Sequence, residues 1–220
     1  MKRTMKKLVA LTVATAVCFP TSLVVSAATP QNDLSISYIE SSQSQLDVVG
    51  MDQYMTLTEQ GTIALDTTSA KNNGFSQEAI AKVQSQINSM NNLVLERKAY
   101  INNSFEAVTN LSRGRAAVRG QSKIVRHWYG LTEVYMNSIE TQALIDNFGR
   151  VSATSTMAGL LSLIPGKLFS NLGVIDTLYS VSVQGYSWQI QQAAKSGRGI
   201  IMNIQINTET NMPMVWFVSQ

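Results

Sequence analysis

Cysteine and histidine are almost missing from this chain of 220 residues, which has one of each, Cys18 and His127. Cys18 lies inside a predicted export signal, so the processed chain would contain no thiol. A disulfide, a cysteine nucleophile and a cysteine-based zinc site are thereby excluded. Glycine-rich phosphate-binding motifs are also absent, because the stretch from Ser112 to Gly120 has neither the Walker spacing nor the dinucleotide-binding spacing.

The remaining residues do not form a recognisable catalytic group. No Gly-x-Ser-x-Gly elbow accompanies His127, and the nearest acid in sequence is Glu133. A lone histidine among aromatic and β-branched neighbours is more often a packed strand residue than a base or a ligand, and we interpret His127 so. The 14 acidic residues show no spacing that singles out a glycosidase-like pair. We therefore expect no catalytic residue, metal site or cofactor, and a function other than that of an enzyme.

The N-terminus has the pattern of a secretory signal. Four basic residues within the first seven precede an apolar segment from Leu8 to Val17, and the small residues Ser26, Ala27 and Ala28 follow. Since a membrane-spanning helix needs roughly 20 apolar residues, a cleaved signal over residues 1–28 is favoured over an anchor helix. The residues before Cys18 lack the usual lead-in for lipidation. We expect a secreted or cell-surface protein.

The net charge of +3 comes from this signal. Four of the 17 basic residues lie in it, which leaves 13 against 14 acidic residues in the remainder. A nearly neutral processed chain gives no electrostatic reason to expect a nucleic-acid partner.

Residues 29–50 are polar and aperiodic, and we interpret them as a flexible lead-in. Residues 51–110 follow as a β-hairpin and an amphipathic helix. Short strands on either side of Gly61 predict the hairpin. Ser76 is a good N-cap, and apolar residues at spacings of three, four or seven then predict a helix as far as about Asn102.

Residues 111–122 form a basic connector in a region that contains no acid. Two interpretations stay open: a solvated loop, or a contact for anionic lipid head groups or wall polymers. The basic residues of this segment and of the strand that follows it are Arg113, Arg115, Arg119, Lys123 and Arg126.

Residues 123–220 predict an α+β domain. Alternation over 123–136 indicates one strand, with Glu133 and Tyr135 on the same face as His127. A helix over 138–148, apolar helices over about 151–195, the second of them over 172–194, and strands over 200–207 and 214–218 follow. The expected fold class is α+β: an N-terminal β-hairpin and amphipathic helix, then a small, mostly antiparallel sheet packed on an apolar helical hairpin.

This hairpin contains the most apolar segment of the processed chain, and Pro165 with Gly166 breaks it. We identify it as a candidate for membrane insertion. The residues that would insert are Leu160, Leu161, Leu163, Ile164, Pro165, Leu168 and Phe169.

Short motifs spread along the chain resemble a group of largely uncharacterised exported proteins of Gram-positive bacteria. The resemblance implies the same α+β architecture and no defined activity, and some members are suspected of being bacteriocin-like. The motifs are Asp52-Gln53-Tyr54, Gly61-Thr62-Ile63, Asn91, Leu93-Val94, Val125-Arg126-His127-Trp128-Tyr129-Gly130, Val134-Tyr135, Ile164-Pro165-Gly166, Gly197-Arg198-Gly199-Ile200-Ile201, Trp216 and Ser219-Gln220.

The sequence leaves two functions open. The first is a non-enzymatic binding or structural protein of the cell surface, in which the apolar hairpin is core. The second is a membrane-active, bacteriocin-like protein, in which residues 151–175 enter a bilayer while the basic residues hold its surface. Burial of apolar surface stabilises a fold by about 25 cal/mol per Å², which favours the first function for the resting state.

Overall fold

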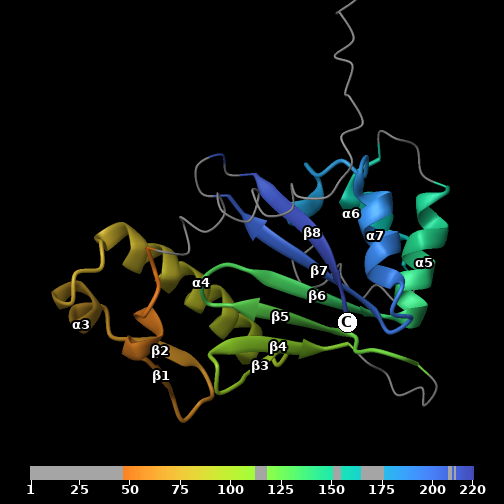
Figure 1. Ribbon diagram of the computed structural model, residues 1–220. Coiled ribbons are helices and arrows are strands. Elements are labelled where there is room, and N and C mark those ends of the chain that lie inside the picture. Colours follow the sequence, from red (N-terminus) through yellow and green to blue (C-terminus); the bar gives the residue numbers. More distant parts are fainter. Residues whose placement is uncertain (1–46, 112–117, 151–154, 165–175, 208–209, 211) are drawn as a thin grey trace, which may run out of the picture.

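The computed structural model describes residues 47–111, 118–150, 155–164, 176–207, 210 and 212–220 (Figure 1). The predicted export signal, most of the lead-in, residues 112–117 of the basic connector and residues 151–154 and 165–175 of the predicted apolar hairpin lie outside these residues. The described residues have an α+β fold with a mostly antiparallel sheet, which confirms the predicted class.

Six strands of the described chain pair antiparallel in the order in which they follow one another in sequence. They are β3 (Tyr100–Ile101), β4 (Glu106–Asn110), β5 (Lys123–His127), β6 (Thr132–Asn137), β7 (Gly199–Ile206) and β8 (Pro213–Ser219). Between β6 and β7 the chain forms α5 (Ser138–Phe148), α6 (Met157–Ser162), the 3-10 helix η3 (Asp176–Leu178) and α7 (Tyr186–Ala194).

One face of the sheet is covered by helices. Ile124, Val134 and Met202, which share this face through the strand register, are buried with residues of α5, α6 and α7. Next to this cluster, Ala107 of β4 belongs to a second buried cluster with α4 (Gln77–Leu95). Because side chains alternate between the faces of a strand, Glu106, Lys123, His127, Glu133 and Tyr135 point to the opposite face.

The N-terminal unit builds the second cluster. It contains η1 (Met51–Tyr54), α3 (Thr67–Asn72) and a separate two-stranded sheet of β1 (Met55–Leu57) and β2 (Ile63–Leu65). Asn91 of α4 joins this small sheet to the helix. Its side chain donates to Ile63 O and accepts from Ile63 N, each at 2.8 Å. The helix thus satisfies backbone groups of a ribbon that would be marginal alone.

The predicted end of the amphipathic helix is wrong. We expected the helix to reach Asn102, but α4 ends at Leu95, and β3 and β4 follow. Arg97 has a left-handed φ of 58° and Lys98 N donates to Leu93 O, an arrangement that terminates helices. Ile101 lies in β3, yet it packs against the same cluster as α4. Its apolar character therefore reflects burial in that cluster and does not indicate a helix.

The single strand predicted over residues 123–136 is also wrong, because this segment is the hairpin β5–β6. His127 N donates to Leu131 O at 2.8 Å and Gly130 N donates to His127 O at 3.0 Å. Gly130 takes a φ of 97°, which glycine adopts at little cost. The alternation continued in phase through the turn, so the predicted sharing of one face by His127, Glu133 and Tyr135 is correct.

The second apolar helix is shorter than predicted. A helix over residues 172–194 was expected, but residues 176–185 contain η3 and turns, and α7 begins at Tyr186. Gly185 ends this irregular stretch with a φ of 91°. Apolar composition alone did not distinguish turns buried in a core from a continuous helix.

Candidate functional site

A polar pocket of about 520 Å³ lies on the sheet face opposite the helices, over β3 to β6. Strand pairing places its side chains together. Glu106 of β4 is opposite His127 of β5, and Val125 and Lys123 of β5 are opposite Glu133 and Tyr135 of β6. The polar residues that define its chemistry are Asn102, Glu106, Lys123, His127, Glu133 and Tyr135.

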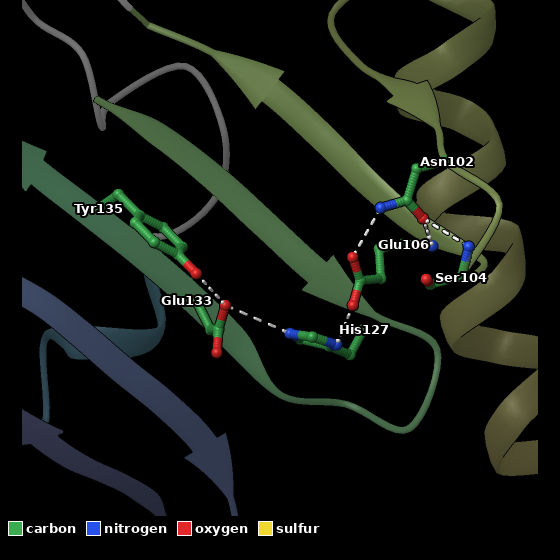
Figure 2. A network of polar contacts seen from close by, with 6 residues as sticks. All are labelled: Asn102, Ser104, Glu106, His127, Glu133 and Tyr135. Carbon is green, nitrogen blue, oxygen red and sulfur yellow. Dashed lines mark hydrogen bonds and ion pairs between the residues drawn. The ribbon is translucent and has the colours of Figure 1, made fainter. Parts of the chain in front are cut away.

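His127 lies between two carboxylates that come from the strands on either side of it (Figure 2). Its Nδ1 is 3.2 Å from Glu106 Oε1, and its Nε2 is 3.6 Å from Glu133 Oε2. The first distance is that of a hydrogen bond and the second is too long for one. The imidazole therefore has one hydrogen-bond partner, Glu106, while its Nε2 faces Glu133 without a hydrogen bond.

Asn102 holds Glu106 in place. Its Oδ1 accepts from Ser104 N and Glu106 N, both at 3.0 Å, and its Nδ2 donates to Glu106 Oε2 at 2.7 Å. Phe105, within this tight β3–β4 turn, has a φ of 56°. Both oxygens of Glu106 are thus fixed, Oε2 by Asn102 of the turn and Oε1 by His127.

The second carboxylate, Glu133, is fixed by Tyr135, whose hydroxyl donates to Oε2 at 2.9 Å. Interaction with the His127 side chain is the main influence that lowers the pKa of Glu133, and the Tyr135 hydroxyl adds to it against the opposing effect of burial. Burial, followed by the hydrogen bond to Glu133, raises the pKa of Tyr135 to about 12. Glu133 is thus ionised and Tyr135 a neutral donor near pH 7.

His127 Nε2 is buried and has no hydrogen-bond partner in the described part of the chain. Its ring also lies 4.9 Å from that of Tyr129 at an interplanar angle of 31°. An unsatisfied polar atom in such a position costs about 1–3 kcal/mol. A group that enters the pocket and hydrogen-bonds to Nε2 would recover this cost.

The pocket is suited to binding polar groups. It offers carboxylate oxygens, amides, an ammonium group and tyrosine rings. The Glu106–His127 pair is the kind that orients a general base, but the described lining contains no serine, threonine or cysteine that it could activate. No group of three or more potential ligands able to hold a metal ion occurs among the described residues.

Lys123 and Arg126, two of the predicted basic residues, lie on opposite faces of the sheet. Lys123 lines the pocket, where its Nζ lies 4.4 Å from the centre of the Tyr135 ring. Arg126 lies on the helix-covered face beside Gln86 of α4, where burial lowers its pKa. Arg119 is exposed. Arg113 and Arg115 lie outside the described residues.

The candidate insertion residues have mixed positions. Leu160, Leu161 and Ile164 are buried in the core beneath the sheet, whereas Leu163 is 50% exposed. Pro165, Leu168 and Phe169 lie outside the described residues. None of the described helices combines the length and the apolar character needed to cross a bilayer.

Sequence reasoning identified His127 and Glu133 and placed them on one face, but it assigned His127 a packing role and did not consider Glu106. Glu106 lies 21 positions before His127 in sequence, and strand pairing alone makes them neighbours.

Comparison of the chain with protein-family models, curated proteins and solved structures gives no match.

Proposed function

We propose that this chain is a secreted or cell-surface binding protein without enzymatic activity, and that its ligand occupies the polar pocket over β3 to β6. The observation that carries the proposal is the buried imidazole of His127, which Glu106 holds in place and whose unsatisfied Nε2 faces Glu133. Binding sites are commonly concave and preformed, with a few oriented polar groups. The export signal predicted over residues 1–28 supplies the expected location.

Binding is the better proposal than catalysis because the pocket offers many hydrogen-bonding groups and few reactive ones. Glu106 is held by Asn102, and Glu133 is held by Tyr135. Side chains that are locked by their neighbours lose little entropy when a ligand arrives, which favours affinity. Lys123 places a positive charge beside the two glutamates of the pocket, and its ammonium group is what would contact the expected partner, an anionic wall polymer or membrane surface.

The membrane-active alternative depends on an apolar helical hairpin at about residues 151–195. Leu160, Leu161 and Ile164 lie in the core, so insertion would first have to remove them from it. This requirement favours the binding protein as the resting state and leaves insertion as an event that would need a trigger.

The test is co-sedimentation with purified Gram-positive cell walls of the protein obtained after expression of the full chain. We expect the protein to sediment with the walls. A double variant, Lys123→Gln with Glu133→Gln, should bind at least about tenfold more weakly, because each change removes a charged hydrogen-bonding group. Glu59→Gln is the control, since Glu59 is an exposed carboxylate outside the pocket.

Liposomes loaded with dye complete this experiment. We expect no dye release from anionic or neutral vesicles at pH 4 to 7.5. Failure of the unaltered protein to sediment with walls would overturn the proposed function, and dye release without wall binding would establish the membrane-active alternative in its place.

A further inference from the structure

We infer that the ligand of the pocket is a carbohydrate that presents two adjacent hydroxyl groups, one to His127 Nε2 and the other to Glu133. The inference rests on the proposed function of a surface binding protein and names the chemical class of its ligand. It starts from the open side of the imidazole, where a buried nitrogen and a carboxylate oxygen face each other at 3.6 Å without a hydrogen bond.

The hydrogen-bonding polarity of this gap defines what can enter it. His127 Nδ1 is engaged by Glu106 Oε1, 3.2 Å away, so the ring nitrogen left for a ligand is Nε2. Glu133 accepts only, because its lowered pKa keeps it ionised. A ligand in this gap must therefore donate to Glu133 and form a second hydrogen bond with Nε2. A vicinal diol can do both whether or not Nε2 carries a proton, since each hydroxyl can donate one hydrogen bond and accept another.

A cationic ligand would also donate, and Glu106 and Glu133 would attract it, but the aromatic face that would complete its site is already occupied. The ammonium group of Lys123 already lies over the ring of Tyr135, 4.4 Å from its centre. This is the aromatic face that a ligand cation would use. A second positive charge would be repelled by the first, whereas a hydroxyl ligand is not.

The rest of the pocket provides the complementary groups. Lys123, Asn110 and Gln121 line the end away from His127 and bring N–H donors. A carbohydrate oxygen accepts from such donors with its lone pairs. The pocket therefore offers acceptors at one end and donors at the other, and only a ligand whose groups do both satisfies the two ends together.

The volume of the pocket and the exposed Tyr100 that lines it agree with a carbohydrate ligand. The volume of about 520 Å³ lies within the range of roughly 300–1,000 Å³ typical of small-molecule sites. Tyr100 lines the pocket with its side chain 51% exposed, so a ring face is accessible for the apolar side of a sugar.

Two sources of vicinal diols occur at a cell surface, glycan strands and linear polyol phosphates, and the experiment separates them. Because His127 is the only histidine, protein labelled with ¹⁵N-histidine gives a single pair of imidazole resonances. The protein from the full chain is titrated with a disaccharide of glucose, whose rings both carry adjacent hydroxyls, with ribitol phosphate and with inorganic phosphate, and the Nε2 and Nδ1 resonances are followed.

We expect at least one diol probe to shift Nε2 more than Nδ1, and inorganic phosphate to shift neither. A response to the disaccharide assigns the glycan strand, and a response to ribitol phosphate assigns the linear polymer. Glu133→Gln should weaken the diol response about tenfold, while Glu59→Gln should leave it unchanged. The titration of the unaltered protein stands even if a variant does not fold.

Failure of this inference can be told apart from failure of the proposed function. If the protein sediments with walls but neither diol probe moves Nε2, or phosphate alone moves it equally, the carbohydrate ligand is overturned and surface binding stands. If walls are not bound and no probe acts, both are overturned.

Discussion

The surroundings of Glu133 and Glu140 shift the pKa values of their carboxyl groups in opposite directions. The pKa of Glu133 is lowered, because His127 and Tyr135 stabilise its charge by more than burial opposes it. The pKa of Glu140 is raised, because burial outweighs the hydrogen bonds that it accepts from Ser122 Oγ and Asn137 N. The sign of each shift depends on whether the hydrogen bonds and charges that reach the carboxylate outweigh its burial, as they do at Glu133 and do not at Glu140.

These directions have different consequences for stability. The lowered pKa of Glu133 means that its contribution is present above its ordinary value of 4.5 and is lost as pH falls through the folded-state pKa. The raised pKa of Glu140 means that the folded state binds its proton more tightly, so its contribution falls as pH rises through 4.5 to the folded-state pKa.

At the scale of single residues, Glu133→Gln should lower the pKa of Tyr135 from about 12 part of the way to the ordinary value of 10.0. The variant removes the negative charge that opposes the phenolate, while burial, the larger influence, remains. Alkaline titration of the tyrosine absorbance, with Tyr135→Phe to assign the signal, measures the shift. An unchanged pKa would contradict the Glu133–Tyr135 contact.

The elements are held at their ends by short-range contacts. Asn137 caps α5, with its Oδ1 accepting from Ile139 N and Glu140 N, and Glu140 completes the capping box. Ser76 caps α4 by accepting from Ala79 N at 3.0 Å. Both helix starts were predicted within a residue, since the residues that decide a cap are adjacent in sequence.

At the scale of elements, we predict that Gly199→Ala destabilises the fold by about 3 kcal/mol or more. Gly199 begins β7 opposite Asn137 with a φ of 116°, and an added Cβ would meet the carbonyl oxygen of Met136 and lie 2.9 Å from the Asn137 carbonyl carbon. Chemical denaturation measures the free energy of unfolding. Since the obstacle is backbone, no side-chain rotation relieves it.

Gly197 is the matched control for this prediction. It also has a positive φ, of 66°, but an added Cβ would meet nothing within 4 Å. Gly197→Ala should cost only about 1 kcal/mol, from the backbone conformation alone. Equal effects at the two positions would show that the close approach of β6 to β7 is not as described.

The largest part of the described chain is the six-stranded sheet with the helices that pack on it (Figure 1). Its helix-covered face is apolar, and the opposite face bears the polar pocket. The segment predicted to insert into membranes contributes Leu160 and Leu161 to the apolar side. Packing in the resting fold therefore explains the apolar character of these two residues.

At this scale, Leu161→Ala should lower the free energy of unfolding by about 2–5 kcal/mol, because Leu161 is 1% exposed. Leu163→Ala, at a position 50% exposed, should cost less than about 1 kcal/mol. Urea denaturation of both variants gives the comparison. Similar small costs would mean that this segment is not part of the core.

The sequence by itself determined the fold class, the starts of α4 and α5 and the two C-terminal strands, because each depends on local periodicity and on caps formed by near neighbours. It did not determine the end of α4, the β5–β6 turn or the extent of α7, where apolar spacing continued across a change of structure. Only the tertiary structure decided the pocket. Glu106, His127 and Glu133 meet through strand register, and register depends on contacts between residues far apart in the chain.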